Sequence, residues 1–380
     1  MRVRRKRGHS CRYIDRFRRG RNGLRRVCLP VGRWAQVWES SISAHKPLRI
    51  ITLWPPGRST KQPKARRLTL CAMDRCLLPF LCALALASCR EQGLSAPTPA
   101  GTQVTFDQSR AWKLLLEQVD IGPRPAGSEG AEANRRLIER ELQAVGLKPV
   151  RESFEDLTPA GKIQFVNVYA DLPGSGTDMV IMGSHYDTKR LPFRFVGAND
   201  AASNTAVLLE VARTLATGKQ RGPTYRFLFI DGEEAVREQW IDPDNTYGSR
   251  FHARKLRDSG QAERVRAFVL LDMVGDADLR LTRDVYSDKR LLEIFHGTAR
   301  KNGLGKYVDG PSMDVRDDHI SFMQVGIPAV DLIDFSYGPG NSYWHTELDT
   351  PERCSEESLG VVGRIVMMGL EVLETGFGRR

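Results

Sequence analysis

Acidic residues are almost absent from the first 72 positions of this chain of 380 residues. Residues 1–72 contain 20 Lys and Arg but only Asp15 and Glu39, and no helical or strand period is sustained there. Residues 73–380 have the opposite balance, with 37 basic and 44 acidic residues. Binding to phosphates needs a surplus of Lys and Arg, so this acidic part is not expected to bind nucleic acid.

The sequence also lacks an apolar run long enough to span a bilayer as a helix. The run from Cys76 to Ala87 has about a dozen residues, follows Met73-Asp74-Arg75 and ends in small residues, which is the pattern of a secretory signal peptide. Leu86-Ala87-Ser88-Cys89 resembles the bacterial lipobox, in which the cysteine is acylated and becomes the mature N-terminus.

These patterns divide the N-terminal part of the chain. We expect translation to begin at Met73, so that residues 1–72 lie upstream of the true start; a basic arm for RNA or a surface, and a disordered tail, are the alternatives. Residues 73–88 are interpreted as a lipoprotein-type signal peptide, and 89–105 as the lipid anchor and a flexible, Pro-containing tether. The protein is then expected to be exported to the periplasm or cell envelope and held on the membrane through acylated Cys89.

Cysteine is scarce in the part that would remain after such processing. Six of the seven cysteines lie at or before position 89, and only Cys354 follows. With Cys89 acylated, no internal disulfide can form. We expect the Cys354 thiol to be inert, because nothing near it in the sequence suggests a partnering base.

Helix and strand patterns alternate from about residue 106 onward, and no internal repeat interrupts them. Apolar periodicity predicts helices at 106–119, 130–145, 203–216 and along a C-terminal segment that contains Leu359 and Leu373. Apolar runs predict strands at Ile163–Ala170, Met179–Ser184, Tyr225–Ile230, Ala267–Leu271 and Ile327–Ile333. This alternation predicts one α/β domain at 106–380, a three-layer α/β/α sandwich around a mostly parallel, mixed sheet.

Polar side chains that carry chemistry follow the ends of these strands, where α/β sheets gather their sites. Each residue alone has a plainer interpretation, such as a structural His, a helix N-cap or a solvated charge. Together they make the mixed nitrogen and oxygen set that zinc takes. The residues are His185, Asp187, Asp200, Glu233, Glu234, Asp272 and His345.

Spacing within this set suggests different tasks. His185 and Asp187 fall on the same side of a strand, which suits a metal ligand whose ring is oriented by a carboxylate. Glu233 and Glu234 are adjacent and must point differently, so one can bind metal while the other carries a proton.

Six segments resemble the zinc aminopeptidase superfamily in their order and spacing, over roughly 110–375. They are GSHYDTKR, FVGANDAASNTAVLLE, FLFIDGEEA, LLDMVGD, DDHISF and YWHTELDT. For a dinuclear aminopeptidase, that resemblance implies two zinc ions, with Glu233 as the general base. The implied ligands are His185, Asp200, Glu234, Asp272 and His345.

Two features resemble one branch, the glutaminyl-peptide cyclotransferases. The stretch AVREQWIDPDNTY, which contains Trp240, separates Glu234 from Gly248-Ser249, and Trp344 precedes His345. That resemblance implies one zinc ion held by Asp200, Glu234 and His345, with Glu233 and Asp272 as catalytic residues. The same resemblance assigns to the substrate pocket Trp240, Trp344, Asp317 and Asp331. It places His185 and Asp187 beside the metal. In this sequence Asp331 stands where animal cyclases tend to have a His.

The implied activity converts the N-terminal Gln of peptides or proteins to pyroglutamate and releases ammonia. The plainer interpretation of Trp240 and Trp344 is packing of a surface loop, and that of Asp317 is an N-cap. A dinuclear aminopeptidase remains the alternative. A catalytically dead, lipid-anchored binding module would need a broken ligand set, and the sequence shows none.

Overall fold

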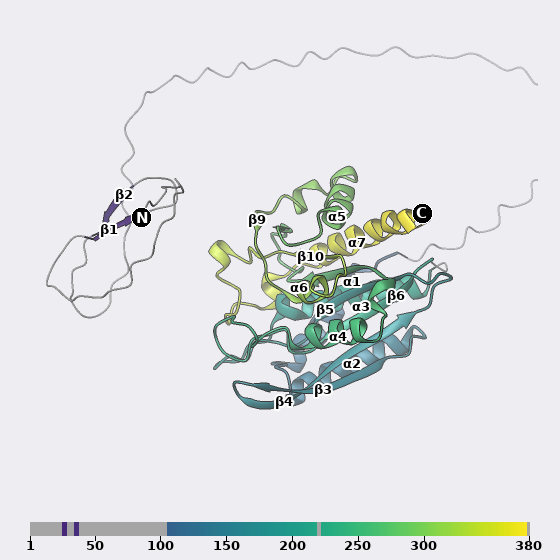
Figure 1. Ribbon diagram of the computed structural model, residues 1–380, viewed down its shortest axis with the longest axis horizontal. Helices are drawn as coiled ribbons and strands as arrows, with labels where there is room; N and C mark the ends of the chain where they lie inside the picture. The colour runs from purple at the N-terminus through teal and green to yellow at the C-terminus, as the bar shows by residue number, and fades with distance from the viewer. Residues whose placement is uncertain (1–24, 29–33, 38–104, 219–221, 378–380) are drawn as a thin grey trace, which may run out of the picture. The chain divides into compact units, whose positions relative to one another are not determined.

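The computed structural model describes residues 25–28, 34–37, 105–218 and 222–377 (Figure 1). Met73, the expected signal peptide at 73–88 and the expected anchor at Cys89 lie outside the described residues. Among the helices that are described, none combines the length and the apolar character that crossing a bilayer requires.

The chain divides into two units, Met1–Glu91 and Gln92–Arg380. In the first, strands β1 (Arg25–Cys28) and β2 (Trp34–Val37) form an antiparallel pair, with Arg25 opposite Val37 and Cys28 opposite Trp34. The sequence analysis expected no strand here, because four residues are too few to establish a period of two.

The second unit is built on a six-stranded sheet with the order β10-β7-β5-β6-β4-β3. Strands β10, β7, β5 and β6 are parallel, whereas β4 and β3 join the β6 edge as antiparallel strands, so the expected mixed sheet is confirmed. The bounds are β3 Val150–Thr158, β4 Gly161–Leu172, β5 Met179–His185, β6 Thr224–Ile230, β7 Val265–Asp272 and β10 Ala329–Ile333. Five of these strands match the sequence prediction, and the mostly polar edge strand β3 was missed.

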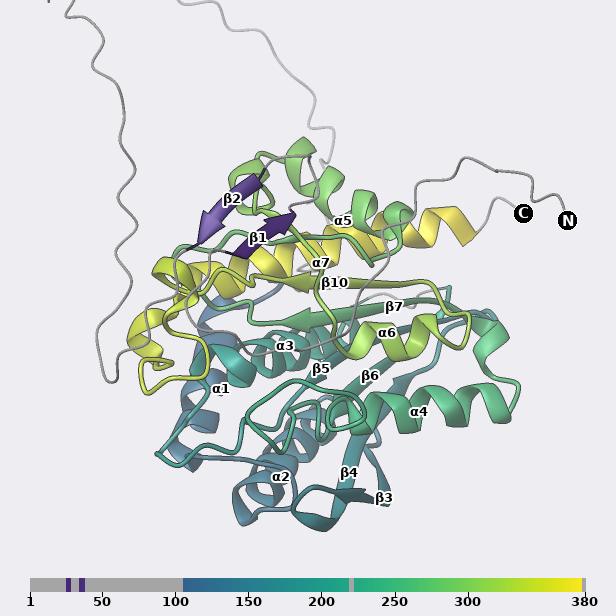
Figure 2. The ribbon, with the colours of Figure 1, turned by 60° about the vertical axis from the view of Figure 1, so that its left-hand side comes forward.

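Helices cover both faces of this sheet, as Figures 1 and 2 show. Alternate strand residues supply the two cores: Val180 and Met182 face one side, and Ile181 faces the other. The first core contacts α1 (Gln108–Ile121), α2 (Glu129–Ala144), α3 (Asn204–Ala216), α5 (Lys289–Lys301) and α7 (Glu356–Phe377). The second contacts α4 (Tyr247–Asp258) and α6 (Asp318–Met323). The expected three-layer sandwich is therefore confirmed.

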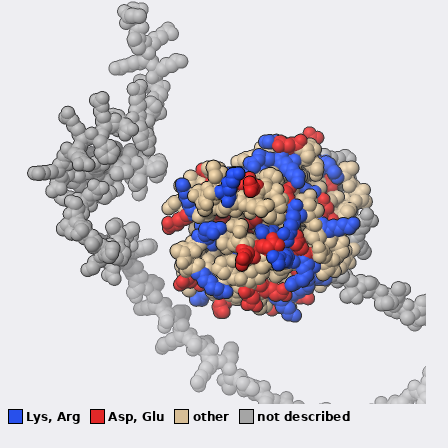
Figure 3. Space-filling model, turned by 90° about the horizontal axis from the view of Figure 1, so that it is seen from below, with Lys and Arg blue, Asp and Glu red and all other residues tan. Residues whose placement is uncertain are grey.

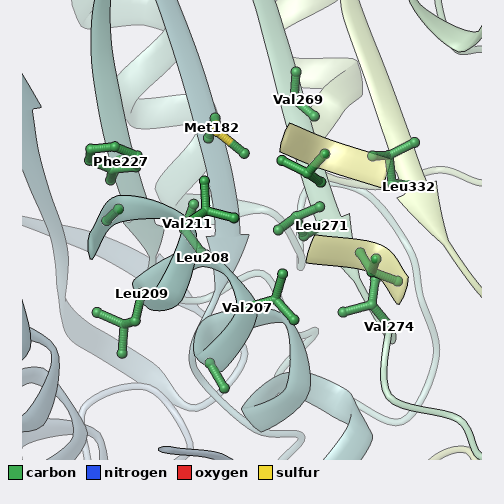
Figure 4. Close-up of a cluster of buried hydrophobic side chains, with 14 of the residues drawn as sticks. Met182, Val207, Leu208, Leu209, Val211, Phe227, Val269, Leu271, Val274 and Leu332 are labelled. Atoms are coloured by element: carbon green, nitrogen blue, oxygen red, sulfur yellow. The ribbon is translucent and has the colours of Figure 1, made fainter. Parts of the chain in front are cut away.

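Figure 4 shows the larger core, where Val207, Leu208 and Val211 of α3 pack near Met182 of β5 and Phe227 of β6. These side chains are fully buried. Each large apolar side chain buried here contributes roughly 1.5–3 kcal/mol to folding. This packing fixes α3 against the sheet, and with it the loop that enters α3 from the carboxyl end of β5.

Helices α1 and α2 begin at side-chain caps that the sequence supplies. The Asp107 carboxylate accepts a hydrogen bond from the Arg110 N–H at the start of α1, and the Ser128 hydroxyl accepts one from the Ala131 N–H at the start of α2. Each cap stabilises its helix by about 1 kcal/mol. Helices α4 and α5 were not predicted.

Short elements complete the unit. Strands β8 (Arg283–Asp284) and β9 (Ser312–Met313) form a parallel pair outside the main sheet. Single helical turns lie at Ala198–Ser203, Ala262–Arg264, Gly305–Tyr307, Pro339–Asn341 and Pro351–Arg353.

Two further features of the second unit are its charged surface and the buried Cys354. Basic and acidic side chains are interspersed on the face shown in Figure 3. Cys354 is 8% exposed and forms no disulfide, its sulfur lies 3.9 Å from the Tyr337 hydroxyl, and burial raises the pKa of its thiol well above the usual value. A thiol in such surroundings is a poor nucleophile.

Candidate active site

A cavity of about 260 Å³ lies where the parallel strands β5, β6, β7 and β10 end. Its wall contains most of the chemistry-bearing residues that the sequence singled out, together with apolar and aromatic side chains. The lining residues are Asp200, Glu233, Glu234, Trp240, Asp272, Met273, Asp314, Val315, Arg316, Asp317, Ile333, Phe335, Trp344 and His345.

Three side chains converge on one point of this wall. His345 Nε2 lies 2.9 Å from Glu234 Oε1 and 3.2 Å from Asp200 Oδ2. One ligand atom from each of the three residues lies within 4.8 Å of the others, so the group could hold a metal ion. An imidazole nitrogen and two carboxylate oxygens are donors that zinc takes.

A second group of three shares Asp200 with the first. His185 Nε2 lies 3.1 Å from Asp272 Oδ1 and 3.2 Å from Asp200 Oδ1, and this group also satisfies the geometry for a metal ion. Both groups are built from residues that the sequence proposed as ligands. Residue geometry alone therefore permits one metal ion or two.

Carboxylates surround both imidazoles and favour a positive charge at each. Burial by itself would lower the pKa of His345, but Glu234 and Asp200 raise this pKa to about 10. The pKa of His185 is also raised well above its usual value, because Glu233 and Asp272 outweigh the effect of burial. The arrangement is thus suited to a cation at this place.

Three carboxyl groups of the cavity wall, those of Glu233, Asp272 and Asp317, have raised pKa values. Burial, followed by repulsion from Asp317 and Glu234, raises the pKa of Glu233 well above its usual value, against the attraction of His185. Burial also raises the pKa of Asp272. For Asp317, burial and the charge of Asp272 raise the pKa to about 7. Buried carboxyls with raised pKa values can carry protons near neutral pH.

Aromatic side chains line the cavity beside the group formed by Asp200, Glu234 and His345. The Trp344 ring stacks on His345 with a centroid distance of 4.1 Å and packs edge-on against Phe335 at 5.1 Å. Trp240 lines the same cavity from the loop after Glu234. His345 (φ 53°) and Met273 (φ 47°) adopt the left-handed region that non-glycine residues rarely occupy, and such strain is common at functional sites.

Asp244 organises the loop that brings Trp240 to the cavity. Its two carboxylate oxygens accept hydrogen bonds from the Val236 and Arg237 N–H groups at 3.1 and 2.9 Å, and the Tyr247 hydroxyl donates a third at 2.7 Å. Because these bonds tie both ends of the loop to one buried carboxylate, the loop is held as a defined wall.

The role of Asp187 differs from the one that its spacing suggested. Its Oδ1 lies 3.7 Å from His185 Nδ1, too far for a hydrogen bond. Its oxygens instead accept from the backbone N–H groups of Glu233 at 3.2 Å and Glu234 at 3.4 Å. Asp187 therefore positions the Glu-Glu pair, and it belongs to neither metal group.

Asp331 lies outside the cavity, although the sequence analysis assigned it to the substrate pocket. It follows the alternation of β10, opposite Leu270 of β7, and so faces the core beneath α6. There it is fully buried, with an oxygen 3.9 Å from His319 Nδ1. It is not among the residues that line the cavity, although the charges of Asp317 and Asp272 in the cavity wall act on its carboxyl group.

Asp317 serves both of the functions weighed from the sequence. It is the N-cap of α6, where its carboxylate accepts a hydrogen bond from the Asp318 N–H, and it also lines the cavity.

Asp349 holds the strand-to-helix loop and was missed by sequence reasoning. Its carboxylate accepts from the Asn199 N–H at 2.7 Å and the Asp200 N–H at 3.2 Å, and the Tyr337 hydroxyl donates to it at 2.9 Å. Gly197 begins the same loop in the left-handed region (φ 52°), and an added Cβ would meet Asp200 O at 2.0 Å. The loop geometry that presents Asp200 thus requires glycine here.

Two buried cations were also missed. Arg124 is fully buried and donates to the backbone carbonyls of Val196 at 2.8 Å and Gly197 at 3.1 Å, which fixes the start of the loop. Lys189 is 2% exposed, and its Nζ lies 3.4 Å from Glu234 Oε2. Nothing local in the sequence distinguishes these cations from solvated surface charges.

Comparison with known proteins agrees with this geometry. The model of peptidase family M28 matches residues 167–370, more than half of the chain. The glutaminyl-peptide cyclotransferase-like protein of Mus musculus is 31% identical over 295 residues, which cover 70% of this chain and 76% of that protein.

Solved structures lead to the same branch of the family. The crystal structure of Acidobacteriales bacterium glutaminyl cyclase is 31% identical, with a TM-score of 0.69, and the match covers 74% of this chain and 99% of that one. Porphyromonas gingivalis glutaminyl cyclase is 26% identical, with a TM-score of 0.65 and coverage of 70% and 99%. The chain therefore belongs to peptidase family M28, within its glutaminyl-peptide cyclotransferase branch.

Proposed function

We propose that this protein is a zinc-dependent glutaminyl-peptide cyclotransferase, which converts the N-terminal Gln of peptides or proteins to pyroglutamate and releases ammonia. The observation that carries the proposal is one cavity whose wall combines the Asp200, Glu234 and His345 group, a separate buried carboxyl, Glu233, and two Trp side chains. The related cyclotransferases support the same reaction.

The donor set fits one zinc ion. Asp200, Glu234 and His345 offer two carboxylate oxygens and one imidazole nitrogen, and catalytic zinc sites commonly use three protein ligands and leave one position for substrate. Zinc held there supplies a Lewis acid that polarises the γ-carbonyl of the substrate Gln. Asp187 and Lys189 support this group by fixing the backbone and the second oxygen of Glu234.

The chain's own residues then manage the protons. The α-amine of the substrate forms a bond to its side-chain amide carbon, the carbon–nitrogen bond of that amide breaks, and the nitrogen leaves as ammonia. Glu233 takes a proton from the attacking amine and returns it to the leaving nitrogen, a task suited to a carboxyl whose pKa burial has raised. Asp272 lines the same wall and receives a hydrogen bond from the leaving amide.

The aromatic walls make cyclisation the outcome rather than hydrolysis. Water attack on the Gln amide would give Glu, so the site must exclude water from the reacting carbon. Trp344, stacked on His345, and Trp240 from the facing loop give this part of the cavity an apolar surface that encloses a small side chain.

A dinuclear aminopeptidase is the second candidate, because His185, Asp200 and Asp272 also form a group that could hold a metal ion. It predicts two zinc ions per chain and release of free amino acids from peptides that begin with Leu. The cyclotransferase predicts one zinc ion and no such release.

The test is to incubate the zinc-loaded full chain with peptides that begin with Gln and with Leu. The proposal expects ammonia release and the matching loss of mass from the Gln peptide, with the Leu peptide intact. Release of Leu without formation of pyroglutamate would overturn the proposal in favour of the aminopeptidase. Metal content, measured on the same sample by elemental analysis, separates one zinc ion from two.

We also propose that the protein is exported and held on the membrane of the cell envelope through acylated Cys89. The support is the sequence pattern of residues 73–89 alone. Metabolic labelling with a fatty acid should mark the native chain but not a Cys89→Ser variant. Peptides from residues 1–72 in the native protein would contradict the expected start at Met73.

A further inference from the structure

A second cavity of about 220 Å³ adjoins the proposed active site. The two cavities share Trp240, Arg316 and Asp317 in their walls, so these three residues form the boundary between them. The second cavity contains none of the metal-group residues. Its remaining wall consists of Asp242, Asn245, Thr246, Arg250, Ile320, Ser321 and Gln324.

The position of this cavity matches the path of a peptide substrate. In the proposed reaction the Gln side chain and the α-amine occupy the first cavity, while the carbonyl of the same residue continues into the rest of the peptide. The following residues must therefore leave the first cavity past its boundary. Trp240 and Arg316 stand on that boundary, and the second cavity lies directly beyond them.

The wall of the second cavity is polar, in contrast to the aromatic surface around the Gln side chain. It presents amide and hydroxyl groups, with Trp240 and Ile320 as its apolar members. Some of these groups already hydrogen-bond to one another, since Asn245 Nδ2 donates to Asp242 Oδ1 at 3.1 Å and the Thr246 hydroxyl to Asn245 Oδ1 at 3.0 Å. The wall is thus prearranged before any ligand arrives.

Two arginines in this wall retain unused donors. Arg316 is exposed, and within the described ranges its guanidinium has no hydrogen bond or ion pair. Arg250 is half-buried over the Tyr247 ring and donates from one terminal nitrogen to Pro243 O at 2.7 Å, while its buried Nε has no partner. A planar guanidinium with free N–H groups is a preferred partner of carboxylates.

Two carboxylates line the same wall, and each accepts a hydrogen bond through one of its oxygens, whereas Asp317 Oδ2 has no partner among the described residues. Asp242 is exposed at the rim and accepts from Asn245, and Asp317 caps α6 through the Asp318 N–H. Neither forms an ion pair with Arg316 or Arg250 in the described part of the chain. Arg316 is exposed and makes no bond within the described ranges, whereas Arg250 is half-buried and already donates to Pro243 O, so Arg316 is the better placed of the two arginines to meet an incoming anion.

We propose that the second cavity is a subsite for a carboxylate in the peptide segment after the N-terminal Gln, with Arg316 as its specificity-determining contact. The inference rests on the proposed cyclotransferase function. The carboxylate has two possible sources, an acidic side chain at position two or three and the C-terminus of a very short peptide. A basic side chain in the same place would meet Arg316 and be disfavoured.

The effect should appear mainly in KM. The carboxylate would bind far from the bond that forms, so its contact is the same in the ground state and in the transition state. An exposed ion pair contributes up to about 1 kcal/mol, which corresponds to about a fivefold change in kcat/KM. Because the pair is exposed, 0.5 M salt should largely remove the preference.

The experiment uses the zinc-loaded full chain and follows ammonia release. The amidated peptides Gln-Ala-Ala, Gln-Glu-Ala, Gln-Ala-Glu and Gln-Lys-Ala test the side-chain source, and Gln-Ala with a free or an amidated C-terminus tests the other. The variants are Arg316→Gln and Arg316→Glu. Arg290→Gln is the matched control, because Arg290 is an exposed arginine on α5 that lines neither cavity.

We expect the wild-type chain to favour the acidic peptides about fivefold over Gln-Ala-Ala through KM. Arg316→Gln should abolish the ratio, Arg316→Glu should invert it toward Gln-Lys-Ala, and Arg290→Gln should keep it. If only Gln-Ala with a free C-terminus is favoured, the subsite stands and the C-terminus is the source of the carboxylate that it binds. Equal kcat/KM for all peptides, with all of them cyclised, would overturn the subsite alone. No cyclisation of any peptide would overturn the proposed function, and the subsite with it.

Discussion

Charged residues have different roles in the parallel half and the antiparallel half of the sheet. In the parallel half, β5, β6, β7 and β10 end at one edge, where Glu233, Glu234 and Asp272 line one cavity and His185 lies buried against Glu233 and Asp272. In the antiparallel half, the charges of β3 and β4 pair mainly with neighbouring elements: Arg151 pairs with Glu132 and Glu139 of α2, and Glu152 pairs with Lys255 of α4. The comparison teaches that parallel strand ends concentrate chemistry, because all of their carboxyl ends meet at the same edge.

The antiparallel half has a buried charged cluster of its own. Glu152 of β3 accepts from Asn167 Nδ2 at 3.0 Å and Lys255 Nζ at 2.9 Å, and His252 Nδ1 lies 2.8 Å from its Oε2. Burial lowers the pKa of His252, so near neutral pH its ring is a neutral hydrogen-bond donor. This cluster joins β3, β4 and α4. It lines neither the active-site cavity nor the second cavity. We interpret it as structural.

Removal of a metal-group side chain should have the largest effect. Replacement of Asp200, Glu234 or His345 by Ala removes one of three protein donors, so zinc content should collapse and ammonia release should fall to background. Elemental analysis and the peptide assay measure both. Glu155→Gln, an exposed carboxylate on β3, is the control and should change neither. Stoichiometric zinc in all three Ala variants would contradict the ligand assignment.

Glu233→Gln should leave zinc bound and lower kcat by about 10²–10⁴-fold, because the amide keeps the size of the side chain but cannot carry a proton. Stopped assays with elemental analysis separate this result from metal loss. Loss of zinc together with activity would mean that Glu233 and Glu234 have exchanged roles.

Trp344→Ala should lower kcat/KM by about ten- to a hundredfold with zinc retained. Loss of a buried aromatic contact costs about 3–5 kcal/mol in a core, and less at a partly open mouth. Trp112→Ala is the matched control, since Trp112 packs against the larger core on α1. It should lower the free energy of unfolding and leave kcat/KM unchanged; an equal loss of activity in both variants would assign Trp344 to stability.

His185→Ala distinguishes one metal ion from two. In a mononuclear enzyme it should keep the zinc ion bound by Asp200, Glu234 and His345, whereas in a dinuclear enzyme it should empty one of two sites. Elemental analysis before and after the substitution gives the count. A fall from two zinc ions to one would favour the aminopeptidase.

The antiparallel cluster should affect stability with little effect on turnover. Glu152→Gln removes a charged acceptor of three hydrogen bonds and should cost about 2–3 kcal/mol of unfolding free energy, with kcat/KM unchanged. Burial lowers the pKa of His252. For Glu152, burial raises the pKa, but hydrogen bonds led by His252 lower it to about 2.

The sign of the pH dependence follows from these two shifts. Both groups bind protons more readily in the unfolded chain, so the stability that these two groups contribute is fully present above pH 6.5. It should fall as pH drops below 6.5 through His252, and again between about 4.5 and 2 through Glu152. Urea unfolding at a series of pH values should show the second decline in the wild-type chain and a smaller one in Glu152→Gln. An equal decline in both would exclude Glu152 as its source.

The sequence by itself determined the layered fold and the chemistry of the strand ends. Short apolar runs predicted five of the six sheet strands, and the polar residues beyond the strand ends included Asp200, Glu234 and His345, which the structure brings together. Such signals are local, because a buried strand and the residues after it are adjacent in the chain. The polar edge strand β3 gave no such signal.

Only the tertiary structure decided what depends on partners far apart in the chain. Asp349 holds the Asp200 loop from 149 positions away, Arg124 is distinguished from a surface arginine only by the carbonyls around it, and Asp331 faces His319 instead of the cavity. The boundary at Arg316 likewise exists only because the loop with Trp240 and the start of α6 meet there. Burial and pairing are properties of the packed chain, so no local pattern could encode them.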